Sequence, residues 1–160
     1  MTISAGDSIP AASLATMGGD GPQGVSTDDL FKGKTVAIFG VTAAFSPTCS
    51  AKHLPGFIQN ADAIKAKGVD EIVCLSVNDV FVMDAWGKDQ SAGDKVTMIA
   101  DGSAEFTKAA GLELDLSSRG LGVRCLRFAM VVEDGVVKSL HIDEAGAFEK
   151  TSAESMLGDL

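Results

Sequence analysis

The chain has 160 residues, of which 46% are hydrophobic and 22% charged. This is the balance of a globular protein, and the length fits one domain, residues 1–160, with a core of its own. No apolar run approaches the roughly 20 residues that a membrane-spanning helix needs. The net charge is −9 and the few basic residues are scattered, so we expect neither nucleic acid nor a membrane as a partner.

Three cysteines, at positions 49, 74 and 125, indicate a reducing compartment. Their odd number and wide spacing argue against a secreted disulfide framework. Residues 1–7 have neither a basic start nor an apolar signal core, so we expect a cytoplasmic protein, or one whose organellar transit peptide has been removed. The chain has no Cys-x-x-Cys pair and only two histidines, and we therefore expect no metal site.

Apolar runs alternate with segments of helical spacing along most of the chain. Residues 4–16 form an N-terminal extension that can supply short edge strands, and the glycine-rich residues 18–24 predict a loop or a hairpin tip. In chain order, the pattern then predicts a strand at Thr35–Val41, a helix at Ser50–Lys67, a strand at Glu71–Val77, a helix from Asp79 to about Lys88, a strand at Val96–Ala100 and a short helix at Ser103–Ala110.

The last third of the chain predicts a hairpin and a closing helix. Asp134-Gly135 favours a positive-φ turn between strands at Arg127–Glu133 and Val136–Ile142. A capping-box spacing starts a helix from about Thr151 to Leu157. Parallel units followed by an antiparallel hairpin indicate an α/β protein with a mixed central sheet flanked by helices, which is the plan of the thioredoxin fold.

The chemistry concentrates where the first buried strand gives way to a helix at about Cys49. Thiols react as thiolates, and a free thiol is only about 3% ionised at pH 7. A helix N-terminus favours the thiolate, but lowering the pKa of the thiol by two to three units needs roughly 3–4 kcal/mol. The dipole alone supplies less, so an arginine from elsewhere in the chain is required. Ser46 either holds a peroxide oxygen or the sulfur, or is an ordinary turn or cap hydroxyl.

Several stretches of this sequence resemble the type II peroxiredoxins, the peroxiredoxin-V-like branch of that family. They are GVTAAFSPTCSAKHLPGF (40–57), EIVCLSVND (71–79), FVMDAW (81–86), ADGSAEFTKAAGLELDL (100–116) and RFAMVVEDGVVKSL (127–140). The resemblance implies that Cys49 and Ser46 occupy the family's Thr/Ser-x-x-Cys positions. It also implies that Arg127 is the arginine over the thiolate, which favours it over the nearby Arg124. Thr42 departs from the pattern, because it stands in the active-site loop, with Phe45, where the family has proline.

The resemblance implies a thiol peroxidase that reduces hydrogen peroxide and alkyl hydroperoxides through a sulfenic acid on Cys49, a reaction that needs no cofactor. Cys74 is either a resolving cysteine, which forms a disulfide with Cys49, or a core residue. The sulfenic acid is then returned to the thiol by glutathione and glutaredoxin or by thioredoxin. A homodimer is common in the family. Two other functions use the same residues: a peroxide sensor that passes oxidation to a partner, and a Cys/His hydrolase with His53 as its base. The hydrolase is disfavoured because no third orienting group is evident.

Overall fold

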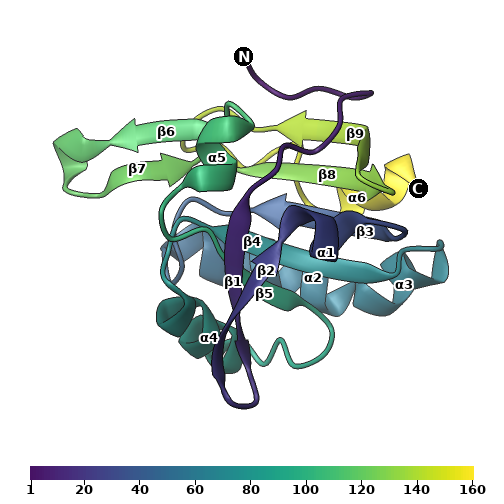
Figure 1. Ribbon diagram of the computed structural model, residues 1–160, viewed down its shortest axis with the longest axis horizontal. Coiled ribbons are helices and arrows are strands. Elements are labelled where there is room, and N and C mark those ends of the chain that lie inside the picture. The colour runs from purple at the N-terminus through teal and green to yellow at the C-terminus, as the bar shows by residue number, and fades with distance from the viewer.

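The computed structural model describes residues 1–160 and contains one large sheet and one small one (Figure 1). The strands of the large sheet are β1 (Ser13–Gly18), β2 (Gly21–Ser26), β3 (Thr35–Gly40), β4 (Glu71–Ser76), β5 (Thr97–Ala100), β8 (Phe128–Glu133) and β9 (Val136–Ile142). They lie in the order β2-β1-β5-β4-β3-β8-β9. Strands β3, β4 and β5 are parallel, whereas β8 runs antiparallel to β3. The expected mixed sheet is confirmed. The predicted N-terminal extension supplies part of β1 in the edge hairpin β1–β2, and residues 18–24, predicted as a loop or a hairpin tip, form the tip and also most of β2.

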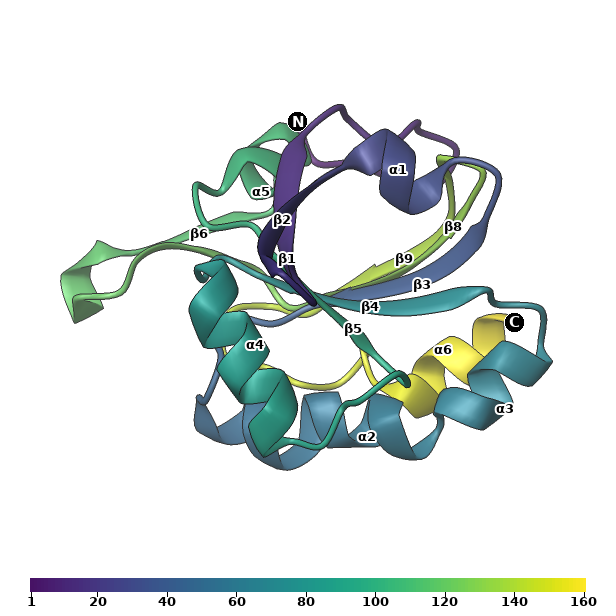
Figure 2. The same ribbon diagram turned by 60° about the horizontal axis from the view of Figure 1, so that its bottom comes forward.

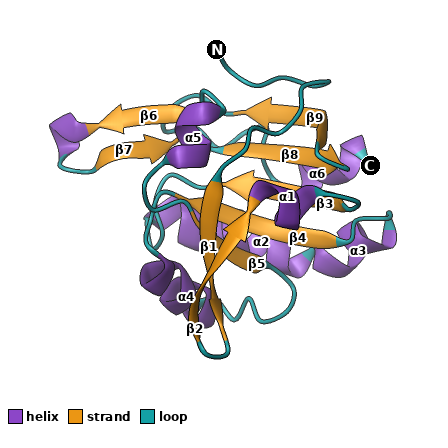
Figure 3. Cartoon of the chain, in the orientation of Figure 1, coloured by secondary structure: helices purple, strands orange, loops and turns teal.

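Helices cover both faces of this sheet (Figures 2 and 3). They are α1 (Thr27–Phe31), a π-helical turn η1 (Cys49–His53), α2 (Leu54–Gln59), α3 (Ala61–Ala66), α4 (Val80–Asp89), α5 (Glu105–Ala109), a 3₁₀ turn η2 (Ser117–Arg119) and α6 (Ala153–Asp159). Figure 2 shows α2, α3, α4 and α6 on one face and α1 and α5 on the other. None of these helices combines the length and the apolar character needed to cross a membrane.

Each face of the sheet has its own hydrophobic core, because side chains alternate along a strand. In β3, Ala37 and Phe39 point into the core under α2 and α4, whereas Val36 and Ile38 point into the core under α1 and α5. Both sets are fully buried, as expected for a strand covered by helices on both sides. Cys49 belongs to the first of these cores.

The helix predicted at Ser50–Lys67 is divided in the structure. It begins at Pro47, passes through the turn η1, continues as α2 and breaks at Asn60 before α3. Pro55 stands at the start of α2; it has no N–H to donate, and its ring crowds the carbonyl one turn earlier. A wider π-helical turn directly before it relieves that crowding. The prediction of one continuous helix was wrong because it took account only of the apolar spacing.

Two further differences lie in the C-terminal half. The two-stranded ribbon of β6 (Glu113–Leu116) and β7 (Gly122–Cys125) was not predicted, because its short strands carry little apolar patterning. The last helix is capped by Ser152, which accepts from the Ser155 N–H, and not by Thr151, whose hydroxyl donates to Asp143. The predicted Asp134-Gly135 turn is confirmed, since both residues have positive φ, 47° and 78°.

Candidate active site

Cys49 lies in the first turn of the helix that follows β3. The chain leaves β3 at Gly40, forms a loop and turns helical at Pro47, two residues earlier than predicted. The Cys49 carbonyl accepts from the Leu54 N–H, which closes the π-helical turn η1. The Cys49 side chain has no solvent exposure. The sulfur is therefore enclosed close to the positive end of a helix.

Ser46 lies just before this helix, and its main-chain carbonyl accepts from the Ser50 N–H at 2.9 Å. The Ser46 hydroxyl donates to the Ala43 carbonyl oxygen at 2.7 Å. A hydroxyl has a single hydrogen, so Ser46 Oγ retains its lone pairs but has no proton left to donate. The side chain is available as an acceptor.

The loop between β3 and the helix also contains Thr42 and Phe45. Its position is fixed by the Ala44 N–H, which donates to Asn78 Oδ1 at 3.0 Å just beyond β4. Thr42 is half-buried, whereas Phe45 is 51% exposed and has a φ of 65°, unusual for a residue with a side chain. The Phe45 ring lies 6.4 Å from Trp86 of α4.

Arg127 reaches the same region from a distant part of the chain. It directly precedes Phe128, which pairs with Gly40 at the end of β3, so it lies beside the start of the loop. The residue is 8% exposed, and its guanidinium lies 5.6 Å from the centre of the Phe148 ring. No carboxylate forms an ion pair with it.

His53, one helical turn after Cys49, binds the guanidinium. Arg127 Nη1 donates to His53 Nδ1 at 2.9 Å, and His53 Nε2–H donates to the Thr151 carbonyl oxygen at 2.8 Å. Arginine only donates and a carbonyl only accepts, so these partners define the neutral Nε2–H tautomer. Burial and the neighbouring Arg127 lower the pKa of His53 to about 3, against the opposing influence of Thr151 and Asp143. A histidine used in this way, with both ring nitrogens engaged, does not act as a hydrolase base.

Comparison with known proteins agrees with this geometry. The chain matches the Redoxin family over residues 4–157. It is 47% identical to Peroxiredoxin-2B of Arabidopsis thaliana, over 97% of this chain and 96% of that protein. It is also 47% identical to the chloroplastic Peroxiredoxin-2E of the same plant, over 98% of this chain and 68% of that longer protein. The chain belongs to the peroxiredoxins. The structure of reduced Prx3 from Vibrio vulnificus in complex with hydrogen peroxide superposes with a TM-score of 0.95, at 46% identity and 99% coverage of both chains.

Membership of this family confirms three expectations at once. The chain has the thioredoxin-like fold, it is an enzyme, and it has the thiol-dependent peroxidase activity of peroxiredoxins. The type II assignment also fits, since the curated relatives named above are peroxiredoxins of the 2 series.

The other two cysteines of this peroxiredoxin are buried and unpaired. Cys74 is in the central strand β4, paired with Phe39 on one side and Met98 on the other. Burial raises the pKa of Cys74 well above its usual value, and charge on Cys49 raises it further. Burial also raises the pKa of Cys125 to about 12, with hydrogen bonding to Thr107 opposing and Asp101 adding to the effect. Both remain thiols at neutral pH.

Arg124, the other arginine near β8, has a different place in the peroxiredoxin structure. Its Nη1 donates to the Val77 carbonyl oxygen at 2.7 Å and its Nε to the Leu121 carbonyl oxygen at 2.9 Å. It joins the β6–β7 ribbon to the segment just after β4, and the choice of Arg127 over Arg124 stays a prediction.

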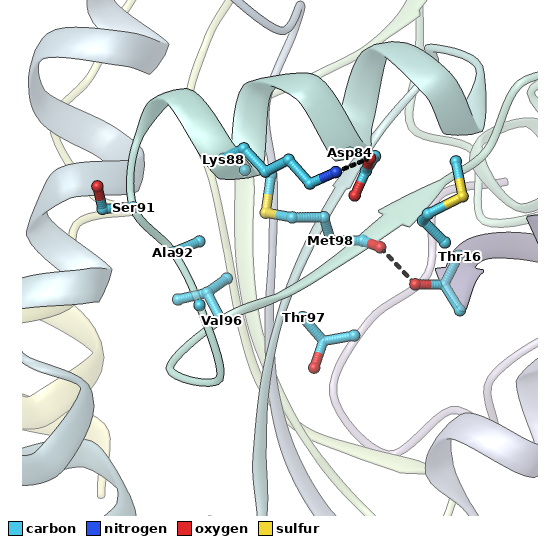
Figure 4. A pocket seen from close by; sticks show the side chains of 11 residues that line it. Thr16, Asp84, Lys88, Ser91, Ala92, Val96, Thr97 and Met98 are labelled. Carbon is cyan, nitrogen blue, oxygen red and sulfur yellow. Dashed lines mark hydrogen bonds and ion pairs between the residues drawn. The ribbon is translucent and has the colours of Figure 1, made fainter. Parts of the chain in front are cut away.

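A hollow of about 580 Å³ lies away from these residues, between α4, β5 and β1 (Figure 4). Asp84 and Lys88 form an ion pair on its α4 side, and the Thr16 hydroxyl donates to the Met98 carbonyl oxygen below them. None of its lining residues belongs to the Cys49 region. This hollow therefore takes no part in the candidate site.

Proposed function

We propose that Cys49 is the residue of this enzyme that attacks the peroxide. The observation that carries the proposal is the state of Arg127: a nearly buried guanidinium with no carboxylate partner. An uncompensated buried charge costs several kcal/mol. A thiolate on Cys49, one turn from the histidine that binds the guanidinium, supplies the missing negative charge. Cys74 and Cys125 are kept protonated by burial.

The reaction that follows is a displacement at oxygen. The Cys49 thiolate attacks one peroxide oxygen, an S–O bond forms, and the O–O bond breaks. The departing oxygen takes a proton and leaves as water or as an alcohol, and the sulfur becomes a sulfenic acid. Arg127 stabilises the negative charge that develops on the leaving oxygen, and Ser46 Oγ accepts a hydrogen bond from the peroxide O–H. No metal or cofactor enters these steps.

The sulfenic acid is reduced by a thiol from outside the chain, in our proposal glutathione with glutaredoxin. Cys74 is enclosed in a strand bonded on both sides, and a disulfide requires Cα atoms within about 7 Å and free side chains. Cys74→Ser should therefore turn over at the wild-type rate with glutathione and glutaredoxin. Turnover with thioredoxin that is lost in Cys74→Ser would instead identify Cys74 as the resolving cysteine.

We further propose that residues 1–160 work as one peroxiredoxin domain and associate as a homodimer in a reducing compartment such as the cytoplasm. Phe45 and Phe81 are 51% and 64% exposed, and Phe45 lies against the helix α4 that also carries Phe81. Exposed aromatic side chains are enriched at protein interfaces. Light scattering should give twice the chain mass for the wild type and a smaller mass for Phe45→Ser/Phe81→Ser.

The assignment of Cys49 is tested by substitution of each buried cysteine in turn. Cys49→Ser should abolish peroxide turnover, while the matched Cys125→Ser variant should retain it. Repeated turnover of the wild type with excess peroxide and reductant also separates a peroxidase from the peroxide sensor, which would turn over slowly. Wild-type turnover in Cys49→Ser would overturn the proposal.

A further inference from the structure

We propose that Asn78 is a positioning residue, which fixes one peptide unit of the loop between β3 and the Cys49 helix and thereby makes the Ser46 hydroxyl an acceptor for the peroxide O–H. The inference rests on the proposed function, in which Ser46 Oγ accepts that hydrogen bond. It assigns a task to a side chain that lies beyond β4 and takes no direct part in the displacement at oxygen.

The peptide unit between Ala43 and Ala44 is held on both sides. Its N–H, on Ala44, donates to Asn78 Oδ1 at 3.0 Å. Its carbonyl oxygen, on Ala43, accepts from the Ser46 hydroxyl at 2.7 Å and from the Ser46 N–H at 3.3 Å. The N–H and C=O of a trans peptide lie in one plane and point in opposite directions, so a contact that fixes the N–H also fixes the carbonyl. The direction in which the Ser46 hydroxyl donates is therefore set by the side chain of Asn78.

The loop does not hold this conformation by itself. Residues 43–46 form a turn in which Phe45 has a φ of 65°, a conformation that strains a residue with a bulky side chain. Residues 41–46 contain no glycine, which would adopt that φ without strain, and no proline, which would restrict the backbone. The bond from Ala44 to Asn78 is the one hydrogen bond that joins residues 42–45 to another part of the chain. The strained turn thus depends on Asn78.

Asn78 is itself fixed between a strand and a helix. Its Oδ1 also accepts from the hydroxyl of Ser76, the fully buried last residue of β4, at 2.7 Å. A main-chain N–H only donates, so the amide oxygen, and not the amide nitrogen, faces Ala44. The next residue, Asp79, caps α4 by accepting from the Val82 N–H at 2.8 Å. The acceptor for the loop is therefore held on a rigid base.

The direction of the Ser46 hydrogen decides what this side chain does in the reaction. With the hydrogen on the Ala43 carbonyl, Oγ presents only lone pairs, which accept from the peroxide O–H. If the peptide turned over, the freed hydrogen would be able to donate to the Cys49 thiolate before peroxide binds. A hydrogen bond that stabilises the resting thiolate does not lower the barrier to attack. Loss of Asn78 should therefore slow the oxidation of Cys49.

Two substitutions of Asn78 and one control separate this role from a loss of stability. Asn78→Ala removes the acceptor, whereas Asn78→Asp keeps an oxygen with the same reach and should restore the bond to the Ala44 N–H. Asn60→Ala is the matched control, because Asn60 is the only other asparagine and its amide donates to the Gly56 carbonyl oxygen and to Glu154, between α2 and α3.

The measurement is the second-order rate of oxidation by hydrogen peroxide, compared at the pH plateau where Cys49 is ionised in every variant. Trp86, the only tryptophan, reports the oxidation, since its Nε1–H donates to the hydroxyl of Ser50 beside Cys49. We expect Asn78→Ala to be roughly 5 to 100 times slower, the range for a donor left without its acceptor. Asn78→Asp and Asn60→Ala should stay within about twofold of the wild type, by the same reasoning.

A double-mutant cycle with Ser46 gives a readout that a merely structural role would not change. In the Ser46→Ala background no hydroxyl is left to orient, so Asn78→Ala should slow the oxidation further by at most about twofold. A thiolate still reacts slowly with hydrogen peroxide without help, so mass spectrometry over hours measures the slow variants. If Asn78 only stabilised the loop, the effects of the two substitutions would multiply.

Thermal unfolding shows which variants are folded at the assay temperature. If Asn78→Ala does not fold, Asn78→Ser, whose oxygen is one bond closer to the main chain, takes its place with the same expected direction. Wild-type oxidation in the folded variant, an Asn78→Asp as slow as that variant, or effects that multiply in the cycle would each overturn this inference and leave the proposed role of Cys49 intact. A wild type whose Cys49 does not react with peroxide would overturn both.

Discussion

At the scale of single residues, the reactivity of this peroxiredoxin depends on how a small set of charges is compensated inside the protein. Arg127 is nearly buried without a carboxylate partner, and His53 binds it without adding charge. Cys74 and Cys125 are held as thiols by burial. Asp143, whose pKa Arg127 helps to lower, forms no ion pair with the guanidinium, and in our proposal a thiolate on Cys49 supplies the negative charge.

Two substitutions of Arg127 should slow the oxidation of Cys49 to different extents. In Arg127→Ala we expect oxidation of Cys49 to slow by roughly 10²- to 10³-fold, the usual effect of removing one preorganised charge stabiliser. Arg127→Lys keeps a positive charge but loses the planar guanidinium, which can bind His53 and the substrate together. Its oxidation rate should therefore lie between those of the wild type and Arg127→Ala. Stopped-flow fluorescence of Trp86 measures all three rates; an Arg127→Ala variant as fast as the wild type would show that Arg127 is not needed.

The candidate nucleophile could be proposed from the sequence, whereas the surroundings of the arginine could not. Cys49 follows a strand and opens a helix, which is a local pattern. The bond from Arg127 to His53 joins residues 74 positions apart, and the bond from His53 to Thr151 joins residues 98 positions apart. Phe148 and Asp143 likewise reach the site only because β8, β9 and the segment after them return to the end of β3. No spacing along the chain signals those contacts.

At the scale of elements, the site depends on how β3 ends. Gly40, the last residue of β3, lies opposite Phe128, and a Cβ built on Gly40 would come within 2.2 Å of the Phe128 ring. A side chain is therefore excluded there by Phe128, the first residue of β8, which directly follows Arg127. The sequence predicted the buried strands to within about a residue, because fully apolar runs are a strong signal. It did not predict the π-helical turn before Pro55 or the break at Asn60, because neither disturbs the apolar spacing.

Gly40→Ala should disturb the arginine without touching any catalytic residue. The new methyl group forces Phe128 aside, which typically costs about 1–3 kcal/mol of folding free energy in a packed core, and Arg127 precedes Phe128 directly. We expect a lower midpoint of urea unfolding and slower oxidation of Cys49. Gly135→Ala is a control for the folding effect, because it strains a positive-φ turn far from any close contact. Wild-type oxidation in a destabilised Gly40→Ala would uncouple the end of β3 from the site.

At the scale of the whole molecule, folding assembles the site from four distant regions: the end of β3, the helix after it, the start of β8 and the segment after β9. The folded protein favours one protonation state of two side chains in these regions, His53 and Asp143. His53 is fully buried and neutral. For Asp143, burial alone would raise the pKa, but hydrogen bonds from Lys150, Thr151 and Glu149, together with Arg127, lower it. The stability of the fold is therefore linked to pH.

The linkage predicts a loss of stability in acid. The pKa of His53 is about 3 in the folded protein against 6.5 as its ordinary value, so between these values the unfolded chain binds a proton that the folded chain does not. The free energy of unfolding should fall as pH drops below 6.5, by up to about 1.4 kcal/mol per pH unit from this group. The free energy of unfolding, measured with urea at several pH values between 7.5 and 4.5, should fall less steeply with decreasing pH in His53→Gln than in the control His141→Gln. The same dependence on pH in both variants would mean that folding does not lower the pKa of His53.

The most direct test of the whole account is to identify the sulfur that peroxide oxidises. Reduced wild-type protein is treated with one equivalent of hydrogen peroxide in the presence of dimedone, which traps sulfenic acids, and the modified peptide is identified by mass spectrometry. We predict that the label is on Cys49 and that Cys74 and Cys125 remain unmodified. A label on either of those two cysteines, or no label on any of the three, would contradict the account.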